Sequence, residues 1–166
     1  MAAPKYLERD GSTGLVTEVA ATESGPASEV IVSTTSGGTI DPSLLPASGA
    51  ATATAGEALS AGDFVYIKAS DGKLYKAVWS SGGNQAIGFV LSSYSSSATA
   101  TYYSAGAQNT SLSGLTTGAR YYGDKTTAGG VTATVPTGTG VLSQFLGYAV
   151  STSAIEVQLM DAIVLA

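Results

Sequence analysis

The chain has 166 residues, of which 44% are hydrophobic and 11% charged, a composition that suits a folded domain better than a disordered chain. It contains no cysteine and no histidine, which excludes disulfides and thiolate zinc sites and removes the commonest general base of enzymes. A net charge of −5, with only seven lysines and arginines, argues against a nucleic-acid partner. We therefore expect a protein that is not an enzyme, holds no metal or cofactor and binds no nucleic acid.

The charge divides the chain into two parts. Residues 1–58 hold seven acids and two bases, a net charge of −5, whereas residues 59–166 hold five of each. The first part also lacks sustained helical or strand periodicity. We interpret residues 1–55 as an extended N-terminal arm and residues 56–166 as a β domain. Residues 1–14 contain no apolar core of signal-peptide length, so we expect synthesis in the cytoplasm and no contact with a membrane.

Apolar side chains recur along the arm. Segments 14–19 and 29–33 are dense in β-branched residues and could pair as strands. The alternative is a disordered tail. Such tails lack large apolar side chains, however, and the burial of each of these stabilises a folded or bound state by about 1.5 to 3 kcal/mol. We expect the arm to dock on another protein through its apolar residues: Leu15, Val16, Val30, Ile31, Val32, Ile40, Leu44 and Leu45.

The segment GGTIDPSLLPASG, residues 37–49, concentrates three of these side chains around two prolines, with Ile40 before Pro42 and two leucines between Pro42 and Pro46. Asp41 can cap a helical turn that Pro42 begins and Pro46 ends. A single turn is too short to be stable alone, so it needs a groove on its own domain or on another subunit. We expect this turn to be a docking point.

The rest of the chain predicts strands. A hairpin is expected where runs 64–68 and 73–79 flank Asp71-Gly72, and further strands at 98–105, 131–135 and 154–159. Glycine and serine/threonine content also favours strands joined by turns, about eight in all. The fold class is therefore all-β, a small β-sandwich or barrel preceded by the arm.

An internal repeat relates residues 59–93 to residues 115–152. Leu59, Gly62 and Tyr66 match Leu115, Gly118 and Tyr122 at identical spacing. Further matches follow after three extra residues in the second copy: Gln85, Ile87, Gly88, Phe89 and Ser92 with Gln144, Leu146, Gly147, Tyr148 and Ser151. We read this as a duplicated three-strand unit.

Two groups of side chains are candidates for a site. Asp63, Asp71 and Asp124 neighbour glycines or turns, where a carboxylate caps local backbone, and we expect that role for them in place of catalysis. The aromatic residues Tyr102-Tyr103 and Tyr121-Tyr122 are adjacent in strands, so one ring of each pair can enter the core while the other faces out. An outward tyrosine, or Trp79, could fill a subunit interface or stack on a sugar.

Several of these motifs resemble those of capsid decoration (cement) and head-fibre proteins of tailed bacteriophages. The arm carries Tyr6-Leu7, Ser12-Thr13-Gly14 and the segment from Gly38 to Pro46. The second repeat resembles a β module that recurs in phage structural proteins, at Gly114-Leu115, Gly118, Tyr121-Tyr122, Gly129-Gly130, Pro136, Gly140, Gln144 and Gly147.

The resemblance implies a virion protein on the outside of an icosahedral head. Such a protein is commonly a homotrimer whose arms grip the major capsid protein and stabilise the shell. The alternative is a head-fibre, tail-fibre or spike module that binds host-surface glycans, although the sequence shows no fibre shaft.

Overall fold

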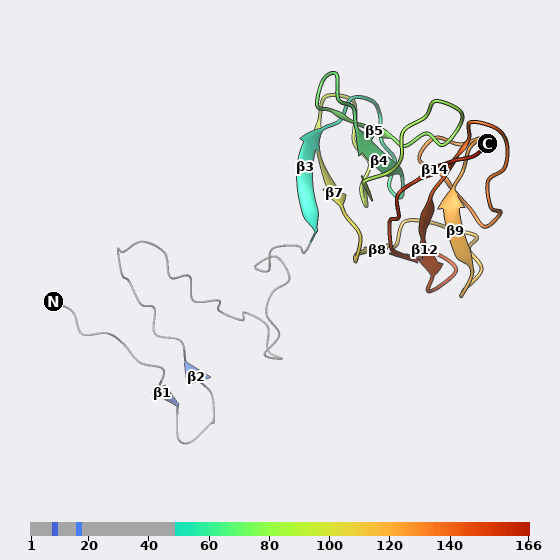
Figure 1. The fold of residues 1–166 in the computed structure, drawn as a ribbon. Helices are drawn as coiled ribbons and strands as arrows, with labels where there is room; N and C mark the ends of the chain where they lie inside the picture. The colour runs from blue at the N-terminus through green and yellow to red at the C-terminus, as the bar shows by residue number, and fades with distance from the viewer. Residues whose placement is uncertain (1–7, 10–15, 18–48) are drawn as a thin grey trace. The chain divides into compact units, whose positions relative to one another are not determined.

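The computed structural model of the chain describes residues 8–9, 16–17 and 49–166 (Figure 1). The chain divides into two units, Met1–Leu44 and Leu45–Ala166. In the first, β1 (Glu8–Arg9) pairs antiparallel with β2 (Val16–Thr17), which lies within the predicted strand segment 14–19. The predicted strand at 29–33 and the docking turn at 40–46 lie outside the described residues.

The described part of the chain is all-β, as predicted, and contains no helix. The first sheet of the second unit has, in spatial order, β3 (Ala50–Thr54), β7 (Thr99–Tyr103), β6 (Gly88–Phe89), β4 (Phe64–Ile67) and β5 (Leu74–Lys76). The second has β8 (Gln108–Asn109), β13 (Ile155–Val157), β12 (Phe145–Ala149), β9 (Arg120–Gly123) and β10 (Val131–Thr132). A two-stranded ladder joins β11 (Leu142–Ser143) to β14 (Ile163–Val164).

The two five-stranded sheets have the same topology. Numbered along the chain within each sheet, the strands lie in the order 1-5-4-2-3 in both, with β11 inserted between β10 and β12 of the second. The duplicated unit thus has five strands where the sequence predicted three. It also includes β3, at Ala50–Thr54, so the first sheet begins before residue 56, where the β domain was predicted to start.

Equivalent backbone hydrogen bonds support this correspondence. Gly62 N donates to Val90 O at 2.8 Å, and Gly118 N donates to Ala149 O at 2.7 Å. Both glycines have positive φ, +93° and +81°, a conformation that other residues rarely adopt. The glycine match seen in the sequence therefore marks the same turn before the same strand in each copy.

The first sheet curls toward a barrel. Ala55, directly after β3, forms a parallel bridge with Leu74 of β5, although β3 and β5 are opposite edges of the sheet. Gly56 N also donates to Leu74 O at 2.8 Å. The inner face encloses a buried apolar cluster of Ala55, Leu59, Val65, Leu74, Val90 and Ala100. Within the described residues, no bridge of this kind closes the second sheet.

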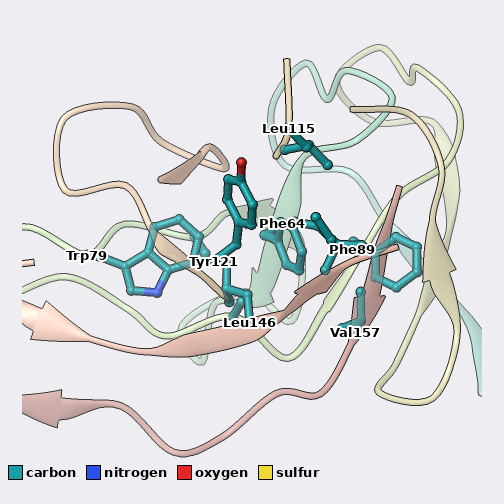
Figure 2. Close-up of a cluster of buried hydrophobic side chains, with 11 residues drawn as sticks. Phe64, Trp79, Phe89, Leu115, Tyr121, Leu146 and Val157 are labelled. Atoms are coloured by element: carbon teal, nitrogen blue, oxygen red, sulfur yellow. The ribbon is translucent and has the colours of Figure 1, made fainter. Parts of the chain in front are cut away.

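The main core lies between the sheets (Figure 2). Because neighbours along a strand alternate faces, Phe64 lies on the outer face of the first sheet while Val65 lies inside it. The outer face of the first sheet packs on the inner face of the second, and the shared cluster comprises Phe64, Ala77, Trp79, Ala86, Phe89, Leu115, Tyr121, Leu146, Ala149, Ile155 and Val157. The molecule therefore combines the two predicted architectures, a nearly closed barrel against an open sheet.

One polar side chain, Gln144, is buried inside this core. Its Oε1 accepts from Trp79 Nε1 and from Ala86 N, both at 2.8 Å. Its Nε2 donates to Ala86 O and to Met160 O, both at 2.9 Å. Burial of an amide is costly unless its hydrogen bonds are made, and here all four are.

The predicted hairpin is confirmed, whereas a predicted strand is shorter than expected. β4 and β5 pair in register, and Lys68 N donates to Lys73 O at 2.9 Å to close the turn. The alternating segment 131–135 forms a strand only as far as Thr132. Thr134 N instead donates to Thr132 Oγ1 at 3.1 Å, a local turn that competes with the sheet ladder.

Candidate functional site

Two of the five aromatic residues predicted as possible interface or ligand contacts lie in the core. Trp79 is fully buried, and Tyr121 is 5% exposed with its hydroxyl accepting a 2.9 Å hydrogen bond from Thr116 N. Neither ring can contact a ligand or a second subunit, so their assignment as possible contact residues was wrong. The physical reason is that both fill the space between the two sheets, where the apolar area is greatest.

The remaining predicted aromatics are half-buried. Tyr103 stacks on Phe89 with ring centroids 5.7 Å apart, at the margin of the main core. Tyr102 points to the opposite face and packs against the cluster inside the first sheet. Tyr122, by contrast, lies on the outer face of the second sheet, since its neighbour Tyr121 points into the core.

The outer face of the second sheet carries a set of aromatic and charged side chains that no other sheet in the described residues covers. We call it the aromatic face, and it comprises Arg120 and Tyr122 of β9, Phe145 and Tyr148 of β12, and Glu156 of β13. Tyr148 is 36% exposed, and Arg120 is exposed as well. This is the most distinctive surface of the described domain.

The rings of this face contact one another. Tyr122 and Phe145 meet edge to face at 5.9 Å between centroids, and Phe145 and Tyr148 at 5.1 Å. The Arg120 guanidinium lies 5.7 Å from the centre of the Tyr148 ring, within the range of a cation–π contact. Tyr148 and Tyr122 raise the pKa of Arg120, and its guanidinium would be charged at any ordinary pH even without this shift.

Strand register arranges two charges on either side of Tyr148. Arg120 and Glu156 each pair directly with Tyr148, from β9 and from β13 respectively. The ion pair found in the described residues joins Lys76 to Asp63 at 3.2 Å, so neither Arg120 nor Glu156 has an oppositely charged partner in that part of the chain. Within the described residues, the row of cation, aromatic ring and anion is therefore not neutralised by an ion pair.

Most of this face was not predicted from the sequence. Adjacent tyrosines were the predicted site residues, and Arg120, Phe145 and Tyr148 were not among them. The repeat contained the missing signal, because Tyr148 matches Phe89 of the first copy. The Phe64–Phe89 pair is buried with centroids 5.9 Å apart, and the equivalent pair in the second copy is Arg120–Tyr148. A charge in place of an apolar core residue indicates a face built to meet water or a polar partner.

The three aspartates have the turn roles that were expected of them. Asp63 accepts from Ser60 N at 2.7 Å, and Asp71 accepts from Lys73 N at 3.1 Å and from the Tyr75 hydroxyl at 2.9 Å. The hydrogen bond from Lys73 lowers the pKa of Asp71. Burial acts to raise the pKa of Asp124, but hydrogen bonds from Thr126 and Thr127 lower it overall.

One shallow cleft of about 140 Å³ lies at the end of β10, lined by Asp124, Lys125, Thr126, Thr132, Thr134, Val135, Pro136 and Thr137. Lys125 is engaged there with Thr137 O at 2.7 Å. Among the described residues, no three acids lie close enough together to hold a metal ion. None of those residues forms a helix long and apolar enough to cross a membrane.

Comparison of the chain with protein-family models, with curated proteins and with solved structures found no match.

Proposed function

We propose that the chain is a structural virion protein that binds the outer surface of a bacteriophage capsid. It stabilises the shell without catalysis or a cofactor, by clamping neighbouring major capsid subunits, after synthesis in the host cytoplasm. The resemblance of the arm and of the second repeat to capsid decoration proteins supports this proposal, as does the division of charge along the chain.

The observation that carries the proposal is the contrast between the two parts of the sequence. Residues 49–166 contain two buried apolar clusters of their own. The preceding residues hold eight apolar candidates for docking and most of the net negative charge. Contacts made by a compact body and by a linked arm reinforce each other, because the arm binds at a high effective concentration once the body is bound.

Co-sedimentation with undecorated phage heads tests the proposal. The full chain should bind the heads and raise their melting temperature, whereas Leu44→Ser with Leu45→Ser should weaken binding by at least about tenfold, since two buried leucines are lost. Val135→Ser is the matched control, because Val135 is 54% exposed in the β domain and should leave binding unchanged. Equal binding by all three proteins would contradict a docking role for the arm.

The resemblance also implies a homotrimer, and sedimentation equilibrium tests it. A molar mass of three chains supports the trimer, and a mass that never exceeds one or two chains contradicts it.

A second candidate function is recognition of host-surface glycans. The exposed Tyr148 ring favours it, because tyrosines and polar side chains together suit a sugar. Binding on a glycan array that is lost with Tyr122→Ala or Tyr148→Ala, while the melting temperature of decorated heads stays unchanged, would favour this function over the capsid clamp.

A further inference from the structure

We propose that the aromatic face is a self-interface, through which two copies of this chain pack face to face about a two-fold axis that is parallel to β12 and lies midway between the two faces. The inference concerns a contact between copies and does not depend on capsid binding.

The two repeats differ in the outer faces of their sheets. In the first copy, the outer face of the sheet is covered within the same chain, where Phe64 and Phe89 pack on the second sheet. In the second copy, the same face carries Arg120 and Tyr148 at the equivalent positions, and both are exposed among the residues that the structure describes. Tyrosine, phenylalanine and arginine are the residues enriched at protein interfaces, because they combine large apolar area with polar groups that tolerate water in the free state.

The charges of the aromatic face are arranged symmetrically about Tyr148. Arg120, Tyr148 and Glu156 form one row across three neighbouring strands, with Tyr148 in the middle. Strands lie about 4.8 Å apart, so the two charged residues are placed at similar distances on opposite sides of Tyr148. Rotation by 180° about an axis parallel to β12, between the two faces and level with Tyr148, brings Arg120 of one copy opposite Glu156 of the other, and this occurs twice per interface.

A second copy of the chain complements this face better than an acidic or a basic partner does. An acidic or a basic partner would satisfy only one of the two charges and would face repulsion from the other. A second copy satisfies both at once and also brings its Phe145 and Tyr148 against their own counterparts. Two sheets can pack at the usual separation of about 10 Å with these rings between them.

A two-fold contact of this kind is separate from the trimer proposed above. If the protein is trimeric, the aromatic face joins chains of different trimers. The molar mass then rises above that of a trimer only through contacts made by this face.

Sedimentation velocity on charge-reversed chains tests the inference. The wild-type chain should self-associate in a concentration-dependent way. The association should be weaker at high salt, because salt screens the attraction between Arg120 of one copy and Glu156 of the other. Arg120→Glu and Glu156→Arg should each weaken this association by at least about tenfold, since each places like charges opposite one another. A mixture of the two variants should associate again, because each reversed residue then meets its complement.

Lys125→Glu is the control, since Lys125 is exposed but lies outside the aromatic face. Far-ultraviolet circular dichroism of every variant should match the wild type. The inference is overturned if the wild type shows no association through this face, if the two single variants associate as strongly as the wild type, or if their mixture stays dissociated. Capsid binding can succeed or fail independently of each of these outcomes, so the two proposals are tested separately.

Discussion

Gln144 illustrates how one residue can hold the two repeats together. It is 1% exposed, and its amide joins Trp79 of the first copy to the loop that precedes β6 and to the C-terminal segment at Met160. Its equivalent in the first copy, Gln85, is exposed and accepts a single hydrogen bond from Ala162 N. The same residue type at matched positions thus has two different structural roles.

This difference predicts unequal costs of substitution. Gln144→Ala should lower the free energy of unfolding by at least about 3 kcal/mol, because it leaves several buried polar groups without partners. Gln85→Ala should cost about 1 kcal/mol or less, since water can replace its bond. Urea unfolding followed by Trp79 fluorescence measures both, and equal losses would contradict the role of Gln144 in the core.

The aspartate turns predict a dependence of stability on acid. The pKa values of Asp71 and Asp124 are lowered in the folded chain, so the contribution of each carboxylate is present above its unfolded pKa and is lost as the pH falls through the folded one. The free energy of unfolding should therefore fall below about pH 4. Between pH 5 and 8 it should stay nearly constant, since the chain has no histidine. Urea unfolding at pH 7, 5 and 2.5 checks this, and equal stability at pH 7 and 2.5 would contradict it.

At the scale of elements, β6 and β12 occupy the same place in their sheets, but β6 buries both of its faces whereas β12 leaves Tyr148 of its outer face exposed. Phe89 of β6 is fully buried, whereas its match Tyr148 of β12 is 36% exposed. Phe89→Ala should cost about 3 to 5 kcal/mol through the cavity it leaves. Tyr148→Ala should cost about 1 kcal/mol or less in the monomer, as expected of a surface site. Thermal unfolding at low protein concentration compares the stability of the two variants. Similar losses of stability would mean that Tyr148 is packed as closely as Phe89, which would contradict this difference.

The elements differ in how far the sequence could predict them. The hairpin of β4 and β5 was predictable because Asp71-Gly72 provides its turn and both flanking runs are rich in strand formers. β3 was not, because its sequence AATAT has no apolar pattern and its pairing is decided by β7, far along the chain. β8, β11 and β14 have two residues each and depend wholly on tertiary pairing.

The candidate site was predictable only in part. Alternation predicted that Tyr121 and Tyr122 point to opposite faces, since this depends on strand geometry alone, but it did not predict which of the two rings enters the core. The burial of Trp79 depends on Gly123 across the sheet interface, where a Cβ would lie 2.1 Å from the indole ring. No pattern within either copy contains that contact. The aromatic face, likewise, follows from the way in which the two sheets pack.

For the whole molecule, the two repeats differ in what their outer faces do. The outer face of the first sheet contributes to the main core of residues 49–166, whereas no other described sheet covers that of the second, where Tyr148 is exposed. A protein that decorates a capsid lattice needs both features: a domain with its own core, and exposed surfaces that contact neighbouring subunits. In our proposal the arm residues bind the capsid and the aromatic face binds a second copy.

The most direct measurement is a cryo-electron microscopy map of phage particles assembled with this chain, compared with particles assembled without it. We expect added density on the outer capsid surface, shaped by two packed β sheets, with residues 1–48 lying along neighbouring major capsid subunits. Particles whose outer surface is the same with and without the chain, or density for it only on a tail, would contradict the proposed function.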